Sequence, residues 1–261
     1  MTGGAQQASG PSPDARTTNG RRIYALGDIH GCLAELDAVY AGIRADLARD
    51  PHPDPVIVHV GDYVDRGPDS RGVIQRLIDW EMPAERICLA GNHDDLMLKF
   101  LDDPHGIWCR FHWLEDPLGG RATLVSYGIE SYALPAEAAA AAAQSAVPQA
   151  HLAFLRGLPR SARIGSYFFA HAGVWPGKPL DAQDPEDLIW IRGEFLTSRA
   201  EHGAIIVHGH TPVEAPDLRW NRINIDTGCV FGRRLTCLVL EGDGIWTLDP
   251  GGRQARDLPS R

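Results

Sequence analysis

Short apolar runs alternate with helical periodicity through the first hundred residues of the chain. The run at 23–26 is followed by apolar residues at helical spacing from Leu33 to Leu47, and the runs at 56–58 and 87–89 are followed by similar patterns. A short apolar run predicts a buried strand, and apolar residues three or four apart predict one face of a helix. Successive strand–helix units predict a parallel sheet with right-handed crossovers.

The pattern changes between residues 103 and 150. A cluster of aromatic residues there precedes a Gly-Gly turn and an alanine run at 138–143. We expect a helical insertion, and a lid over a binding site is a second interpretation because long connections near such sites are often functional. The chain after residue 150 is rich in strand-like runs, and we expect it to end in a hairpin. These runs lie at 167–170, 204–207, 223–225 and 235–240.

The two ends of the chain differ from the part between them. Residues 1–20 are rich in Gly, Gln, Ser, Thr and Pro and offer little apolar surface, so we expect a disordered tail. A length of 261 residues fits one large domain. We therefore expect a single domain over residues 21–250, with the insertion at 103–150 inside it, and a flexible C-terminus over 251–261.

Composition narrows the class of protein. The net charge of −9 argues against a general nucleic-acid-binding protein, because such proteins need a basic surface to displace counterions from phosphates. The five cysteines are widely spread and lack paired CxxC spacing, which favours a reducing compartment. The sequence has no apolar run of transmembrane length and no signal sequence, so we expect a cytoplasmic protein without membrane partners. No feature predicts an oligomeric state.

Five polar clusters directly follow predicted strands, at the edge where open α/β sheets place ligand-binding loops. Asp28 and His30 are two residues apart, so in an extended segment their side chains point to the same side. Every cluster supplies Asp, Asn or His, the ligands suited to Mn, Fe or Zn. Together they predict a metal site. The clusters are 27–31 (GDIHG), 61–67 (GDYVDRG), 91–94 (GNHD), 171–173 (HAG) and 208–211 (HGHT).

The ordered set GDIHG, GDYVDRG, GNHD, HAG and GHT resembles the calcineurin-like metallophosphoesterases. More narrowly, it is similar to their bacterial phosphoprotein phosphatase branch, to which the phage lambda phosphatase belongs. The resemblance covers Ile23 to about Leu240. It implies an α/β fold in which a two-sheet β-sandwich is flanked by helices in four layers (αββα), with a dinuclear metal centre at the loop edge.

The resemblance assigns six side chains to two divalent metal ions, with Mn expected before Fe or Zn. Asp62 would bridge the two ions. Two carboxylates against two divalent ions leave a positive surplus, which favours binding of a phosphate dianion. The other ligands would be Asp28 and His30 for the first ion, and Asn92, His171 and His210 for the second.

The resemblance also implies catalytic and substrate-binding roles. His93 would be the general acid that protonates the leaving group, and Asp65 would orient it. Arg66 and Arg192 would hold the phosphate oxygens, with Asn92 beside them, because a planar guanidinium suits that geometry. A hydroxide that bridges the metal ions would attack phosphorus directly, so no covalent phosphoenzyme is expected.

Three functions remain open on these residues. We expect a phosphatase acting on phosphate monoesters, with phosphorylated Ser and Thr side chains as the leading substrate, because the dinucleotide branch commonly lacks a carboxylate at Asp65. The first alternative is a symmetrical diadenosine polyphosphate hydrolase, which Asp94 favours. The second is a catalytically silent scaffold, which the complete residue set disfavours. The expected partner is a phosphoprotein or a small phosphorylated substrate.

Overall fold

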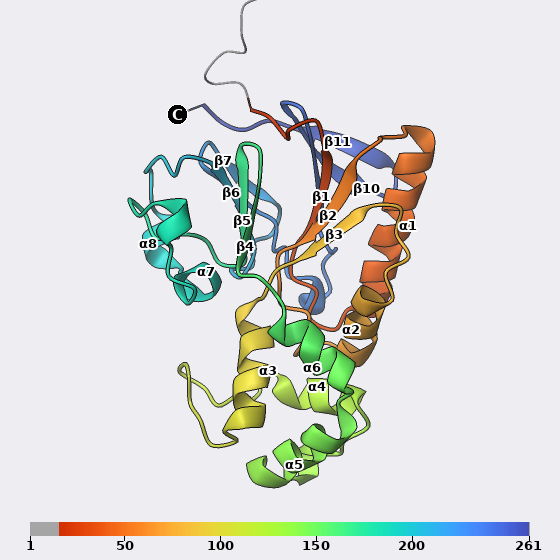
Figure 1. Ribbon diagram of the computed structural model, residues 1–261, viewed down its shortest axis with the longest axis vertical. Helices are drawn as coiled ribbons and strands as arrows, with labels where there is room; N and C mark the ends of the chain where they lie inside the picture. The colour runs from red at the N-terminus through yellow and green to blue at the C-terminus, as the bar shows by residue number, and fades with distance from the viewer. Residues whose placement is uncertain (1–15, 261) are drawn as a thin grey trace, which may run out of the picture.

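The computed structural model describes residues 16–260, which form two mixed sheets packed face to face and flanked by helices (Figure 1). The first sheet has the order β11-β10-β9-β1-β2-β3 and the second the order β4-β5-β6-β8-β7. The expected two-sheet α/β fold is therefore confirmed. The first sheet contains β1 (Arg22–Leu26), β2 (Pro55–His59), β3 (Glu85–Cys88), β9 (Cys237–Glu241), β10 (Gly244–Asp249) and β11 (Gly252–Arg256).

The second sheet contains a parallel centre, in which β5, β6 and β8 run in the same direction, and two antiparallel edges. Its loops therefore leave β5 and β6 at the same end, as those of β1, β2 and β3 do in the first sheet. Its strands are β4 (Ser161–Ile164), β5 (Tyr167–Ala170), β6 (Ile205–His208), β7 (Asp217–Arg219) and β8 (Arg222–Asn224).

The helices cover the outer faces of the sheets and the end from which these loops emerge (Figure 1). Within the insertion, α4 packs against α2, and α5 packs against α3. The helices are α1 (Leu33–Arg49), α2 (Ser70–Ile78), α3 (Asn92–Asp102), α4 (Gly120–Ser126), α5 (Ala136–Ala146), α6 (Gln149–Arg156), α7 (Asp187–Trp190) and α8 (Gly193–Leu196), with short 3-10 turns η1 (Ser131–Ala133), η2 (Leu180–Ala182) and η3 (Cys229–Phe231).

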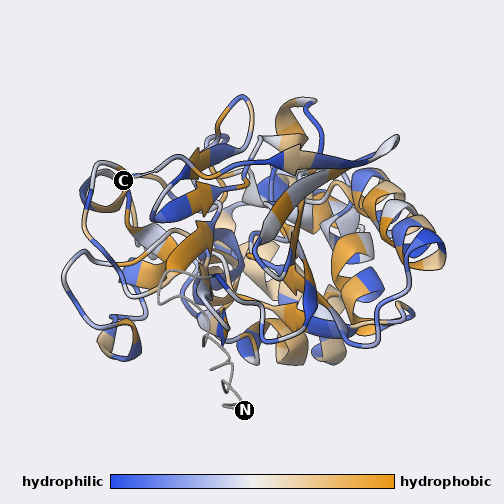
Figure 2. Ribbon diagram, turned by 90° about the horizontal axis from the view of Figure 1, so that it is seen from above, coloured by the Kyte–Doolittle hydropathy of each residue, from blue (hydrophilic) through white to orange (hydrophobic). Residues whose placement is uncertain are grey.

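Strand β1 explains why the sequence showed a continuous apolar run rather than alternation. Tyr24 and Leu26 belong to the core between the first sheet and the helices, whereas Ile23 and Ala25 belong to the core between the sheets. A strand covered on both faces needs apolar side chains at every position. In Figure 2 several strands accordingly carry hydrophobic stretches, while the peripheral helices carry both hydrophobic and hydrophilic stretches.

Both expected domain ends differ from the structure. Thr18 is buried, and the backbone of Thr17 bonds to Ser166, so the described part of the expected tail, 16–20, is ordered. Residues 1–15 of that tail lie outside the described residues. Beyond residue 250, strand β11 pairs with β10 along its length, so the sheet continues into the segment that we expected to be flexible. No helix within residues 16–260 is long and apolar enough to cross a membrane.

The buried His59 gives the fold a pH-dependent stability. The hydroxyl of Tyr40 lies 2.8 Å from His59 Nε2 and the carbonyl of Ile87 lies 3.3 Å from Nδ1, which satisfies a neutral ring. Burial lowers the pKa of His59 to about 3, against about 6.5 in the unfolded chain. Between these values the unfolded state binds the extra proton, so this contribution to stability falls as the pH falls.

We expect His59→Gln to flatten the pH dependence of the free energy of unfolding between about pH 3 and 6.5. One titrating group contributes a slope of up to about 1.4 kcal/mol per pH unit. Urea unfolding at several pH values, with a chelator present in every sample, measures the slopes of the variant and the parent protein. Equal slopes would contradict the assignment to His59.

Candidate metal centre

Loops from both sheets meet at one end of the sandwich, close to where α3 begins (Figure 1). The first sheet supplies the clusters after β1, β2 and β3, and the second supplies those after β5 and β6. The side chains that we expected to bind metal are at most 5% exposed. Burial of so many polar groups is costly unless they are paired or coordinate a metal. These residues are Asp28, His30, Asp62, Asn92, His171 and His210.

Asp62 lies at the centre of this site. One of its carboxylate oxygens, Oδ2, is 3.4 Å from His30 Nε2 and 3.4 Å from His171 Nε2. Two groups of side chains close enough to hold an ion share it. One consists of His30, Asp62 and His93, and the other of Asp62, His171 and His210. A carboxylate between two such groups has the placement of a bridging ligand.

The histidine tautomers leave lone pairs facing the site. His30 Nδ1 lies 2.7 Å from the carbonyl oxygen of Val64, and His171 Nδ1 lies 3.1 Å from that of Val60. Because a carbonyl only accepts, each Nδ1 carries the proton and each Nε2 is an acceptor. Burial, the largest cause in each case, lowers the pKa of both rings, which keeps them in the neutral form that binds metals.

Asn92 and the two histidines of the second group present acceptors that face one another. His171 Nε2 lies 2.9 Å from Asn92 Oδ1 and 3.2 Å from His210 Nδ1, and Asn92 Oδ1 lies 2.8 Å from His210 Nδ1. His210 Nε2 is buried and has no hydrogen-bond partner within residues 16–260. Two acceptors at 2.9 Å repel each other, and a cation between them would remove that repulsion. The residues present therefore fit a divalent metal ion.

Asp28 lies beside these groups and not within either of them. Its carboxylate accepts a hydrogen bond of 3.0 Å from the backbone N–H of His210. Gly209 permits this approach, because a Cβ there would meet the Asp28 carboxylate. Burial, with Asp226 and Asp62 as further causes, raises the pKa of Asp28 well above its usual value. A nearby cation would offset this cost of ionisation.

The backbone at the site adopts unusual conformations. Within residues 16–260, six residues other than glycine have positive φ, and five of them are in the site clusters. Positive φ costs energy for residues with a Cβ, and such positions concentrate at functional sites when the surrounding structure holds them. The five are His30 (46°), Asp62 (56°), Asp65 (75°), Arg66 (67°) and His210 (67°).

His93 and Asp65 form a buried pair held by the insertion. Asp65 Oδ2 accepts hydrogen bonds from His93 Nδ1 at 2.7 Å and from Trp113 Nε1 at 2.8 Å. Thr123 Oγ1 donates to the other carboxylate oxygen at 2.8 Å. The ring of His93 stands edge-on to that of His30, with centroids 4.7 Å apart. Trp113 and Thr123 therefore give the insertion a role that the sequence did not reveal, which is to fix Asp65.

The two expected arginines differ in how firmly they are placed. Arg66 Nη1 donates to His30 Nε2 at 2.7 Å, which places its guanidinium at the site. Arg192 is exposed, and its Nη1 lies 3.5 Å from Thr211 Oγ1. Although the residue is exposed overall, partial desolvation of its guanidinium lowers the pKa of Arg192, which Asp62 opposes and the nearby Arg66 reinforces. The Arg192 guanidinium thus lies within electrostatic reach of Asp62.

Two acidic residues have positions that the sequence reasoning missed. Asp226 follows β8, is 3% exposed and contacts Asp28, and burial raises its pKa to about 6. The signal was available, because Asp226 comes shortly after a strand, as the other clusters do. Asp94 accepts three backbone hydrogen bonds, from Gly91, Asp62 and Tyr63, each 2.9 Å long. It therefore ties two site loops together.

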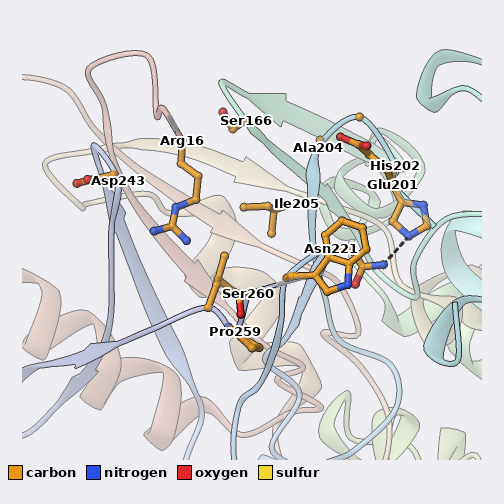
Figure 3. A pocket seen from close by; sticks show the side chains of 13 residues that line it. Arg16, Ser166, Glu201, His202, Ala204, Ile205, Asn221, Asp243, Pro259 and Ser260 are labelled. Atoms are coloured by element: carbon orange, nitrogen blue, oxygen red, sulfur yellow. Dashed lines mark hydrogen bonds between the residues drawn. The ribbon is translucent and has the colours of Figure 1, made fainter. Parts of the chain in front are cut away.

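A cysteine cluster and a separate pocket lie outside the set of predicted site residues. Cys32 and Cys229 are buried, in contact, and grouped with the exposed Glu35. Figure 3 shows a pocket of about 700 Å³ that is lined by residues near both ends of the described chain and by Asn221, which lies 3.4 Å from His202. None of the site residues lines this pocket, so its size does not make it the site of the chemistry.

The buried Asp and His groups and the two-sheet fold define a metal-dependent phosphoesterase. Comparison with known proteins agrees: residues 21–245 match the family described as calcineurin-like phosphoesterases, so the chain belongs to that family. Members of this family use a dinuclear metal centre. The expected family is thus confirmed.

Three relatives show the range of proteins that this chain resembles. It is 28% identical to bis(5′-nucleosyl)-tetraphosphatase PrpE [asymmetrical] of Anoxybacillus flavithermus, covering 82% of this chain and 88% of that protein. It is 30% identical to serine/threonine-protein phosphatase 1 of Salmonella typhimurium, covering 84% and 91%. A crystal structure of a candidate diadenosine tetraphosphatase has the same fold, with a TM-score of 0.60, 24% identity, and coverage of 89% and 97%.

Proposed function

We propose that this chain hydrolyses phosphate esters with two divalent metal ions, Mn before Fe or Zn, bound around Asp62. The observation that carries the proposal is the convergence of buried acceptors on that carboxylate from both sheets. When bound, the ions would supply positive charge for the phosphate and lower the pKa of a water molecule. The proposed ligands are Asp28, His30, Asp62, Asn92, His171 and His210.

Metal analysis and turnover of p-nitrophenyl phosphate test this proposal. We expect about two divalent ions per chain, loss of turnover after treatment with a chelator, and recovery when Mn is added back. Zn and Fe in parallel samples identify the preferred ion. A chelated, metal-free protein that turns over at an undiminished rate would contradict the proposal.

The residues around the site support a reaction with a poor leaving group. Arg66 and Arg192 would hold the phosphate oxygens. His93 has its Nδ1 engaged by Asp65, so its Nε2 would carry the proton delivered to the leaving oxygen. The alkoxide of Ser or Thr is strongly basic and needs that proton. We therefore propose phosphorylated Ser and Thr side chains as substrates, supported by the firmly held His93–Asp65 pair.

A second candidate is hydrolysis of dinucleoside tetraphosphates, which the name of the A. flavithermus relative favours. The alternative that the sequence left open was a symmetrical hydrolase, whereas that relative is named asymmetrical. A phosphoserine peptide and diadenosine tetraphosphate, offered separately with Mn, compare the two substrate classes. Two molecules of ADP would identify symmetrical cleavage, and ATP with AMP asymmetrical cleavage. No turnover of either substrate would leave the silent scaffold as the remaining interpretation.

A further inference from the structure

A second pocket, of about 410 Å³, lies next to the candidate metal centre. Arg66 belongs to both, since its guanidinium bonds to His30 and also lines the pocket. The opposite walls come from two other parts of the chain. The insertion contributes 114–122 and Tyr132, and η3 contributes Phe231. The pocket is therefore open to whatever group is attached to a phosphate held at Arg66.

Several contacts hold Arg66 between the candidate metal centre and this pocket. Its backbone N–H donates to the carbonyl of Gly119 at 3.2 Å, and its Nη2 donates to the carbonyl of Pro117 at 3.3 Å. Its guanidinium carbon lies 6.0 Å from the centre of the Phe231 ring, within the range of a cation–π contact. A single guanidinium thus separates the His30 side of the metal centre from an aromatic face.

Two large aromatic side chains are exposed at this pocket. Phe231 is 61% exposed and Tyr132 is 69% exposed. Arg121, which also lines the pocket, has its guanidinium carbon 5.9 Å from the centre of the Tyr132 ring. Exposed aromatic rings beside guanidinium groups are the combination on which nucleobases stack while phosphates are neutralised. A volume of this size also suits a small ligand of nucleoside dimensions.

We infer that this pocket binds the nucleoside half of the substrate, with its base on Phe231 and Tyr132 and its phosphate at Arg66. This inference rests on the proposed phosphohydrolase activity and concerns its second candidate substrate class, the dinucleoside polyphosphates. The aromatic rings account for recognition of a base, and the arginines account for recognition of its phosphates. A peptide side chain in the same pocket is the competing occupant.

The small separation between the His30 side and the Phe231 side of Arg66 indicates which phosphorus atom of the substrate is attacked. With the base at Phe231, the phosphorus nearest to His30 is the one bonded to the nucleoside. Water then forms a new bond to that phosphorus, and the bond from phosphorus to the bridging oxygen breaks. The nucleoside triphosphate leaves with that oxygen, and the nucleoside monophosphate keeps the oxygen of water. Diadenosine tetraphosphate hydrolysed in ¹⁸O-labelled water is therefore expected to give labelled AMP and unlabelled ATP.

Phe231→Ala and Tyr132→Ala test the pocket. Loss of one stacking partner is expected to raise KM for diadenosine tetraphosphate by about 5- to 150-fold. The readout is the ratio of kcat/KM for the dinucleotide to that for a phosphoserine peptide without aromatic residues, which is expected to fall by a similar factor. Phe231→Tyr keeps an aromatic ring at this position and is expected to show the same ratio as the parent protein. Ile107→Ala removes an exposed apolar side chain of the same insertion and serves as the control.

The outcomes separate failure of the pocket from failure of the proposed function. An unchanged ratio in both alanine variants, with thermal melting equal to that of the parent protein, overturns the nucleoside assignment. A selective rise in KM for the phosphopeptide overturns it in favour of a peptide-binding pocket. If the parent protein with Mn hydrolyses neither substrate nor p-nitrophenyl phosphate, the phosphohydrolase proposal fails instead.

Discussion

His93→Asn is expected to lower kcat for a phosphoserine peptide by about 10²- to 10⁴-fold, the usual contribution of a general acid. The variant keeps a polar side chain of similar size but carries no proton that it could release to an alkoxide. Its effect should be much smaller for p-nitrophenyl phosphate, because nitrophenolate is a weak base that leaves without protonation. Steady-state kinetics with both substrates measures the difference.

The metal content of the variant decides between two roles for His93. His93 lies close enough to His30 and Asp62 to be a ligand. If it is the acid, His93→Asn retains both ions and loses turnover selectively with the poor leaving group. If the variant loses an ion, or loses turnover equally with both substrates, His93 acts through the metal centre and the assignment as a general acid is wrong.

Asp62→Asn is expected to abolish the binding of both ions. Asp62 belongs to both groups of candidate ligands, and removing its charge weakens each. The metal ions supply several kcal/mol of transition-state stabilisation in such enzymes, so kcat should fall by at least about 10³-fold. The backbone N–H of His93 donates to Asp62 Oδ1 at 3.0 Å, and Asn keeps an oxygen that can accept this bond. The local structure should therefore persist.

Metal analysis, with Asp102→Asn as a control, measures this effect. Asp102 ends α3 and its side chain is 76% exposed, so its substitution changes the same charge without touching the site. The control is expected to keep both ions and full turnover. An Asp62→Asn protein that holds two ions and turns over normally would show that the metals, if they are used, lie elsewhere.

The sequence predicted the elements with strong local patterns. β1, β2 and β3 were visible because strands covered on both faces form continuous apolar runs, and the site clusters were visible because they follow such strands. β4 was missed because three of its four residues are partly or fully exposed, which leaves no apolar run to detect. β11 was missed for the same reason, since only Gly252 is buried.

Contacts between distant residues account for most of what the sequence left out. Asp65 and Trp113 are 48 positions apart, and their hydrogen bond depends on how the insertion packs against α2 and α3. Cys32 and Cys229 meet for a similar reason. Asp94 kept the dinucleotide branch open as the alternative, and its contacts add a structural role in linking two loops. Periodicity reports burial along one element and carries no information on such pairings.

The left-handed backbone conformations of the five site residues destabilise the loops that contain them. Each of these five positions costs about 1 kcal/mol or more, and a domain of this kind is stable by only about 5–15 kcal/mol in total. The packed core between the sheets must therefore hold the loops in conformations that would be unfavourable for the loops in isolation. If the packing of that core were slightly weakened, the loops would lose these conformations while the sheets remained folded. Activity would then be lost under conditions well short of those that unfold the protein.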